Sequence, residues 1–391
     1  MTFDSKSIEP IIEANIISKK FISATKPMPK SDSVESSSST HSSPFSAPNL
    51  DTPISSAGSV SGELTKLDRP IAYQTENMSF GQSRIYLPSL FLEDKTVYNC
   101  TISYRFAGPV SITRLENALQ LVTQRHEAFR SSFYVDPLSG SPTQSISETS
   151  RFSLKKIPLA NDTSDVKEEF RRIHNYVYDL EAGDTFISTI LSHEVNSHTI
   201  IFGYHHIIMD GVSWQVFLRD FGLLYAKVPP NLPAETTYLE FTKKQKIQSA
   251  SGAYSDRLEF FAKEFPEPPA PLPLFPFAKT STRKPLTRYD TLDIVIDIEP
   301  RLVSQIKKAS LATRTTAFHF WLSTFQVLLH RFLDIDQMCI GIVDANRSDQ
   351  TFMNTVGFLL ELLPVNFKVK KHQKFSEILQ QVSASFSSFG R

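Results

Sequence analysis

Cysteine is nearly missing from this chain, with only Cys100 and Cys339 among 391 residues. Both lie in segments that we predict to be strands, so we interpret them as small buried hydrophobic residues rather than a disulfide pair, in a reducing compartment. Apolar runs are short as well, and none approaches the roughly 20 residues that a membrane span needs. The N-terminal stretch mixes charge into its apolar residues, unlike a secretory signal. We therefore expect a cytoplasmic protein with no membrane partner.

An excess of either charge is also missing, because Lys+Arg and Asp+Glu both number 41. A formally neutral chain has no overall attraction to nucleic acid, so we expect no nucleic-acid partner. The motifs Gly-x-Ser-x-Gly and Walker A are not found, nor is a glycine-rich dinucleotide fingerprint or a Cys/His signature. No covalent serine or cysteine route and no directly bound cofactor is indicated.

The chain is rich in phenylalanine and proline, with 30 Phe and 24 Pro, and the prolines are concentrated in connecting stretches. A Ser/Pro-rich stretch over 27–70 has few large apolar residues, which predicts a disordered linker or tail after a short segment over 1–26. A second Pro-rich stretch over 266–285 predicts a connection between two lobes, 71–265 and 286–391. Each lobe mixes helices with strands, so the predicted fold class is α/β in the broad sense that includes α+β.

Hydrophobic spacing predicts the main elements. In the first lobe we predict strands at 98–107, 131–135, 152–157, 186–195 and 198–206, the last two as a hairpin, and helices at 111–129, 164–180 and 212–228. In the second lobe we predict a strand near 291–298, helices at 301–311, 315–333 and 375–389, a strand at 337–347 and an extended segment at 355–369.

The stretch "YHHIIMDGVSW" places His205 and His206 at the end of a predicted strand. Neighbouring side chains on a strand point to opposite faces, so the two rings diverge and cannot share a metal ion. A neutral imidazole at a strand end can take a proton at neutral pH. We predict that one histidine is functional and the other supportive, and that no metal is bound.

Asp210 stands just before the predicted helix, where two interpretations remain open. Its carboxylate either orders the site beside the histidines or only caps the helix that opens at Val212. Ser213 is a hydrogen-bond donor in the first helical turn. The histidines themselves fit either a reactive site or a set of core groups with hydrogen-bond partners.

These residues resemble the signature of condensation domains in nonribosomal peptide synthetases, within the HHxxxDG acyltransferase group. Three further segments match the family in order: "MSFGQSRIYLPSL" at 78–90, "RHEAFRSSF" at 125–133 and "VGFLLELLPV" at 356–365. The segments "FGQSR", "AFHFWLSTFQVLLHRF" and "IGIVDANR" and the Ser-rich upstream stretch favour fungal polyketide–peptide hybrid synthases.

The resemblance implies two chloramphenicol-acetyltransferase-like lobes in a V-shaped pseudodimer with a tunnel between them. It implies that a donor acyl carrier protein and an acceptor peptidyl carrier protein present thioesters on phosphopantetheine arms, and that an amide bond forms between them. His206 corresponds to the catalytic histidine and His205 to the structural one. Asp210 is implied to be mainly structural, and Gly211 to allow a tight turn.

The resemblance also implies an arginine partner for Asp210 from the second lobe. Arg347 in "DANR" is our candidate, with Arg125 and Arg130 as alternatives. The chain departs from the family at a missing Trp after Tyr238, at Phe261, and at an asparagine position occupied by Leu360 or Glu361. It stops at Arg391, before the family's final elements, which implies an incomplete second lobe.

Two other functions compete with amide formation. An inactive or docking remnant would expose a sheet edge that needs a partner. A stand-alone acyltransferase that uses acyl-CoA would carry a late DFGWG motif, whereas "RDFGLLY" at 219–225 lies too early for that role.

Overall fold

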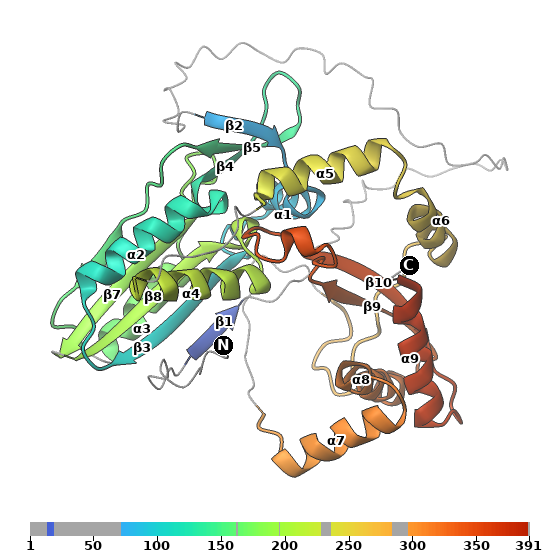
Figure 1. Cartoon of the computed structure of the whole chain (residues 1–391). Helices are drawn as coiled ribbons and strands as arrows, with labels where there is room; N and C mark the ends of the chain where they lie inside the picture. Colours follow the sequence, from blue (N-terminus) through green and yellow to red (C-terminus); the bar gives the residue numbers. More distant parts are fainter. Residues whose placement is uncertain are drawn as a thin grey trace, which may run out of the picture. The chain divides into compact units, whose positions relative to one another are not determined.

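The computed structural model describes residues 14–18, 72–161, 163–194, 196–227, 236–283 and 296–389 (Figure 1). The linker predicted over 27–70 lies outside these ranges, as does most of the strand predicted near 291–298. Within them, helices and mostly antiparallel strands are mixed, in agreement with the predicted fold class.

A five-stranded sheet organises the first half of the chain. Its strand order is β1 (Ala14–Ser18), β3 (Asn99–Ala107), β8 (Ser197–His205), β7 (Phe186–Glu194) and β6 (Leu154–Ile157). Only β6 and β7 run parallel, and β7 and β8 form the predicted hairpin. The β-branched and apolar residues of β8 place it at the centre, where it is buried on both faces.

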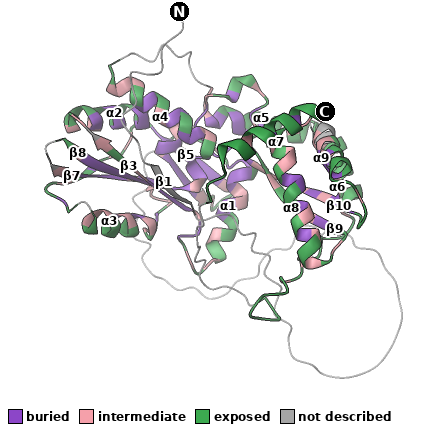
Figure 2. Cartoon of the chain, turned by 90° about the horizontal axis from the view of Figure 1, so that it is seen from below, coloured by how far each residue is buried: buried purple, intermediate pink, exposed green. Residues whose placement is uncertain are grey.

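Helices cover both faces of this sheet, which Figure 2 shows as buried strands between two helical layers. α2 (Ile112–Arg125) and α4 (Gly211–Tyr225) pack on one face through a core that contains Leu119, Phe202 and Phe217. α3 (Ser164–His174) packs on the other face through Ile173 and Ile201.

The helix predicted to continue to residue 180 ends instead at His174. Asn175, the C-cap residue, donates its backbone N–H to the carbonyls of Arg171 and Ile173 and closes the last turn. Val177, which lies inside the predicted range but beyond the end of α3, is exposed.

A smaller three-stranded sheet has the order β2 (Ala72–Asn77), β5 (Pro142–Ser147) and β4 (Ser131–Val135). Three helices were not predicted from the sequence: α1 (Phe80–Phe91), α5 (Tyr238–Ala250) and α6 (Ser255–Glu264). The helix predicted over 111–129 ends at Arg125 as α2, and the short 3-10 helix η2 (Glu127–Arg130) follows it. Both α1 and α5 begin with complete capping boxes, Ser79 with Gln82 and Thr237 with Glu240.

The second half contains a β9–β10 hairpin and three helices. These elements are α7 (Pro300–Ala312), α8 (Ala317–Leu333), β9 (Gln337–Asp344), η4 (Gln350–Phe352), β10 (Glu361–Lys368) and α9 (Phe375–Phe389). The extended segment predicted at 355–369 is a strand only over the range of β10. Leu322, Leu329, Val365 and Val382 form part of the local core.

The connection from β9 to β10 leaves this core and enters the core of the first half. Val356, Phe358 and Leu360 are buried among Ile85, Phe202 and the other residues of the main cluster. Packing therefore joins the two halves through one segment, residues 345–360, and this segment builds the site described below.

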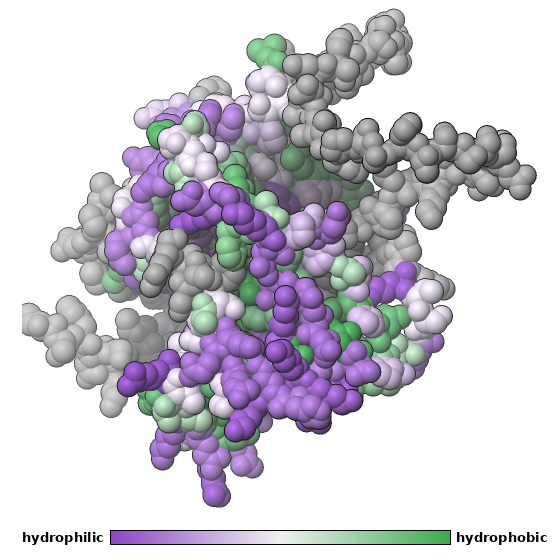
Figure 3. Space-filling view, turned by 90° about the vertical axis from the view of Figure 1, so that its right-hand side faces the viewer, coloured by the Kyte–Doolittle hydropathy of each residue, from purple (hydrophilic) through white to green (hydrophobic). Residues whose placement is uncertain are grey.

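The surface of the described residues has both hydrophilic and apolar areas. Figure 3 shows a largely hydrophilic face with smaller hydrophobic areas between the polar ones. One side of α8 is an exception and exposes five large apolar side chains, each between 41% and 51% accessible: Phe318, Trp321, Phe325, Leu328 and Phe332. No helix in the described ranges is long and apolar enough to cross a membrane. Cys100 in β3 and Cys339 in β9 are free thiols in strands, as predicted, but only Cys100 is buried and Cys339 is half-buried.

Candidate active site

His206 lies just past the end of β8 and opens a short 3-10 turn, η3 (His206–Ile208). The sequence placed it on the strand itself, on one face with Tyr204, but its backbone N–H donates to the carbonyl of Tyr98 and its carbonyl accepts from Met209. The chain thus turns sharply between the two histidines. The ring of His206 meets Phe358 edge-on, with centroids 5.1 Å apart.

The backbone fixes the tautomer of His206. Its Nδ1 lies 2.8 Å from the carbonyl oxygen of Met209. A carbonyl can only accept, so Nδ1 carries the proton and Nε2 carries the lone pair. Burial lowers the pKa of His206, and the Met209 carbonyl and Asp210 oppose this shift without cancelling it. The ring is consequently neutral at pH 7, with a basic nitrogen at Nε2.

His205 has the opposite proton arrangement. Its Nδ1 accepts the backbone N–H of Ile207 at 3.2 Å, so the ring proton is on Nε2. The side chain is buried, and burial lowers its pKa to about 3. Its ring lies edge-on to Tyr98 and Tyr178, away from the Phe358 that contacts His206. The adjacent rings therefore have different neighbours, and His205 caps the turn that carries His206.

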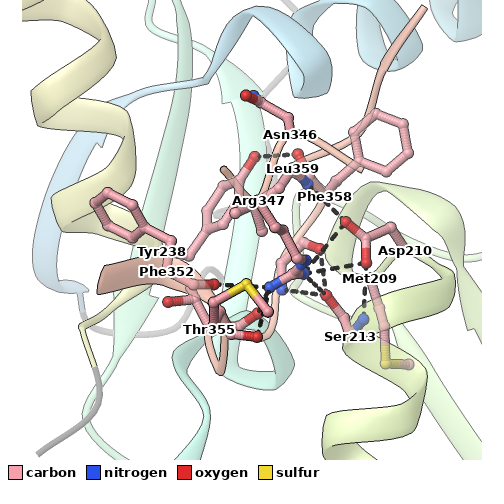
Figure 4. Close-up of polar contacts among 12 residues, drawn as sticks. Met209, Asp210, Ser213, Tyr238, Asn346, Arg347, Phe352, Thr355, Phe358 and Leu359 are labelled. Carbon is pink, nitrogen blue, oxygen red and sulfur yellow. Dashed lines mark hydrogen bonds and ion pairs between the residues drawn. The ribbon is translucent and has the colours of Figure 1, made fainter. Parts of the chain in front are cut away.

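Asp210 is the centre of a buried polar cluster (Figure 4). It is the N-cap of α4 and accepts the N–H of Ser213 at 2.8 Å. The same carboxylate accepts the N–H of Leu359 at 3.0 Å and a guanidinium N–H of Arg347 at 3.2 Å. Its own N–H donates to the carbonyl of Gly357 at 3.2 Å. Asp210 is thus a helix cap that also binds Arg347 and the backbone at Leu359, so the interpretation that it only caps the helix is wrong.

Arg347 reaches Asp210 from the connection that follows β9. Its Nη1 donates to the carbonyls of Phe352 and Thr355, at 2.8 and 2.9 Å. Its Nη2 donates to Ser213 Oγ at 2.7 Å as well as to Asp210. A buried guanidinium needs several acceptors as well as a counter-charge, and this set supplies them. Ser213 Oγ completes the cluster by donating to the carbonyl of Gly357 at 2.7 Å.

The other two candidate arginines lie elsewhere, so neither is the partner of Asp210. Arg125 approaches the buried carboxylate of Asp220, with its Nε 3.4 Å away. Arg130 donates to the carbonyls of Ser147 and Glu148 at the edge of the small sheet. Both lie on the α2–η2 segment, whose charged groups are directed toward α4 and β5.

The explanation offered for Gly211 is wrong in one respect. This residue starts α4 with a helical backbone rather than in the left-handed region, so no tight turn requires glycine. A Cβ built on it meets nothing within 4 Å. Gly211 leaves open space beside Asp210 instead of making a strained turn.

Sequence reasoning missed the role of Tyr238. Its hydroxyl donates to the carbonyl of Phe358 at 2.7 Å and accepts from Ser79 Oγ at the same distance. A Cβ on Gly357 would lie 1.9 Å from the tyrosine ring, so only glycine fits there. The "VG" of the late motif was the available signal, because an apolar run interrupted by glycine indicates a close approach of backbone.

Glu361, one of the two residues that can correspond to the family's asparagine, pairs with Arg84 of α1 at 3.0 Å. Arg84 also donates to the carbonyl of Leu360 at 3.1 Å. Burial raises the pKa of Glu361 against the opposing effect of Arg84. This departure from the family pattern therefore has a partner on α1. In the described ranges, no group of three or more His, Cys, Asp or Glu side chains is placed to hold a metal ion.

A mixed fold with a buried HHxxxD segment and an arginine-bridged carboxylate agrees with the class of domain that the sequence resembles. Residues 73–389 match the family model of the condensation domain, so the chain belongs to the condensation-domain family. The structure resembles the condensation domain of the monacolin K polyketide synthase MokA, with a TM-score of 0.73 and 22% identity, over 81% of this chain and 73% of that one. It resembles the first condensation domain of the CDA synthetase with a TM-score of 0.69 and 17% identity, over 81% and 75% of the two chains. The predicted chloramphenicol-acetyltransferase-like fold is thereby confirmed.

Among proteins of known name, the chain is similar to the PKS-NRPS hybrid synthetase psoA of Aspergillus fumigatus, with 49% identity over 324 residues. It is also similar to the hybrid synthetase himA of Aspergillus japonicus, with 45% identity over 301 residues. These alignments cover 82% and 76% of this chain but only 8% of each relative. The resemblance to fungal hybrid synthases is confirmed, and the chain spans about a twelfth of the length of these relatives.

Proposed function

We propose that this chain forms an amide bond between two carrier-bound substrates. The donor is a polyketide or peptidyl thioester on the phosphopantetheine arm of an acyl carrier protein, and the acceptor is an aminoacyl thioester on a peptidyl carrier protein. The amine nitrogen attacks the donor carbonyl carbon, the carbon–nitrogen bond forms and the carbon–sulfur bond breaks. The donor arm leaves as a thiol.

The tautomer of His206 is the observation that supports this proposal. Its Nε2 carries a lone pair because Nδ1 donates to Met209. That nitrogen can accept the proton that the amine loses as it attacks, and then return it to the departing sulfur. A thioester is already reactive, so holding the amine close supplies much of the rate through effective molarity.

The Asp210 cluster has a positioning role in this proposal. Asp210 directly follows Met209, whose carbonyl accepts the proton of His206 Nδ1, while Arg347 and the Leu359 N–H hold the carboxylate of Asp210. Asp210 and Arg347 therefore fix the segment that carries Phe358 against His206. Gly211 leaves the neighbouring space open.

The test compares His206→Gln and His206→Ala with the unaltered chain, using an acyl carrier and an aminoacyl carrier and mass spectrometry of the amide product. We expect a loss of about 10²–10⁴-fold in turnover with an unchanged circular dichroism spectrum. His193→Gln is the matched control, because this histidine lies in β7 and bonds Ala160 and Thr199 instead. Unreduced turnover in His206→Gln would refute the site, and turnover with free acyl-CoA but not with carriers would refute the donor.

A further inference from the structure

Four polar atoms near His205 are buried without a hydrogen-bond partner in the described ranges. They are Asn99 Oδ1, Thr101 Oγ1, Thr185 Oγ1 and the hydroxyl of Tyr178. The side chains that carry them are at most 7% exposed. Native proteins leave few such groups unsatisfied, so four in one place need an explanation.

The strand register brings three of these atoms together. Asn99 is directly opposite His205, and Thr101 is directly opposite Gly203 in the same β3–β8 pair. On the other side of β8, the carbonyl of Thr185 accepts the N–H of His205 at 3.0 Å. Directly opposite residues place their side chains on one face of a sheet, here the face covered by α3.

Tyr178 lies over the same face of the sheet as these residues. Its ring centroid lies 6.2 Å from that of His205. Its hydroxyl lies 2.7 Å from the point where a Cβ on Gly203 would stand. The absent side chain of Gly203 thus lets the phenol lie over the sheet at this residue, which is directly opposite Thr101.

Two members of this group, Asn99 and His205, have fixed donor and acceptor atoms. Asn99 donates from Nδ2 to the carbonyls of His174 and Tyr176, at 2.9 and 2.7 Å, which leaves Oδ1 as an acceptor. His205 holds its proton on Nε2, because Nδ1 accepts from Ile207. Hydroxyl groups on the remaining residues can do either. A small neutral ligand that donates and accepts matches this set, whereas the buried site offers no charge for an ion.

We propose that ordered water occupies the space bounded by Asn99, Thr101, Tyr178, Thr185 and His205. Buried waters in proteins typically make about three hydrogen bonds to groups of this kind. The water accepts from Nε2 of His205 and so stabilises the tautomer whose Nδ1 receives the Ile207 N–H. Tyr178 and Thr185 are then positioning residues that act through His205 on the turn of His206.

A crystal structure of the full chain, at a resolution that shows ordered solvent, tests the site without reference to activity. We expect water within hydrogen-bond distance of at least two of the four orphaned atoms. A dry space, or direct hydrogen bonds among the side chains in place of water, would overturn the proposal.

The consequence for His205 is tested by ¹⁵N NMR of the imidazole nitrogens in Tyr178→Phe and Thr185→Val. Both variants keep the shape of the side chain and remove one hydroxyl. We expect the signals of His205 to shift from a single Nε2–H tautomer toward a mixture. Ser188→Ala is the matched control, because its hydroxyl is also buried without a partner but lies opposite Phe202, on the other face of the sheet.

The turnover of Tyr178→Phe, compared with that of the unaltered chain, gives a further test, which rests on the proposed function. We expect turnover to fall about fivefold in Tyr178→Phe with an unchanged KM, the effect of about one hydrogen bond. If His206→Gln is inactive while both hydroxyl variants keep the native His205 signals, the water site is refuted and the amide-forming function stands. If no variant or wild-type chain forms amide, the NMR and crystallographic results still decide the water site.

Discussion

Two histidines that are adjacent in the chain carry their protons on different ring nitrogens, and backbone groups decide which. A carbonyl from Met209 faces Nδ1 of His206, whereas an N–H from Ile207 faces Nδ1 of His205. The turn that separates them thus produces one ring with a basic Nε2 and one with an Nε2–H. A substitution of His205 therefore disturbs His206 through the turn, even though the two rings have different neighbours.

The pH dependence of the two rings should differ. Burial lowers the pKa of both below the usual 6.5, for His205 to about 3. We expect an NMR titration to show His206 gaining its proton with a midpoint below pH 6.5, and His205 still neutral at that point. A midpoint for His206 above 6.5 would contradict this prediction.

The same shifts affect stability. Between pH 6.5 and about 3 the unfolded chain binds a proton at residue 205 that the folded chain does not. The contribution of His205 to stability is therefore complete above pH 6.5 and is lost as the pH falls toward 3. Urea midpoints measured at pH 7 and pH 5 should show this decrease.

At the residue scale, strand alternation predicted that the two rings diverge, and they do have different neighbours. The reason was wrong for His206, which lies in a 3-10 turn just past β8 and not on the strand. The 3-10 turn was not predictable, because it depends on the carbonyl of Tyr98, which directly precedes β3 and receives the N–H of His206.

Helix α4 connects the site to the second half of the chain through its first turn. Replacing Arg347 by Met leaves the buried carboxylate of Asp210 without its counter-charge. We therefore expect the free energy of unfolding, measured with urea, to fall by about 3–5 kcal/mol. Asp210→Asn keeps a capping side chain and removes the charge. The double variant should then be less destabilised than the sum of the two single variants. Additive effects would show that the ion pair contributes nothing.

Two glycines at this site should respond differently to alanine. Gly357→Ala forces a methyl group into the ring of Tyr238, and we expect it to lower the free energy of unfolding by about 1–3 kcal/mol. Gly211→Ala adds a methyl group in open space on a helical backbone, and we expect a change within about 0.5 kcal/mol. Thermal unfolding of the two variants makes the comparison, and equal effects would contradict it.

At the element scale, periodicity located the central strands and most helices, whereas the family resemblance supplied Arg347 as the candidate partner of Asp210, which the structure confirms. It did not find α1 or α5, whose hydrophobic faces are weak and whose positions depend on contacts with the 345–360 segment. The hydrogen bond from Leu359 to Asp210 was equally beyond prediction, because it joins backbone and side chain 149 residues apart.

Across the whole molecule, a segment that belongs to the second half by sequence is buried in the core of the first. Val356, Phe358 and Leu360 are each at most 8% exposed. A boundary drawn from the Pro-rich stretch at 266–285 follows the composition of the chain but not its packing. The local sequence pattern indicates which residues are apolar. Only the folded structure shows in which core each of them is buried.

The outer side of α8 gives the chain a strip of hydrocarbon that faces solvent. Its apolar residues follow one another at intervals of three and four, so the strip is continuous along the helix.

On a phenyl-substituted chromatography resin, such a strip should retain the protein until the salt concentration is low. Phe325→Ser with Leu328→Ser should bring elution forward and leave the melting temperature nearly unchanged, since neither side chain is buried. Equal retention of this variant and the unaltered chain would mean that the strip is covered in solution.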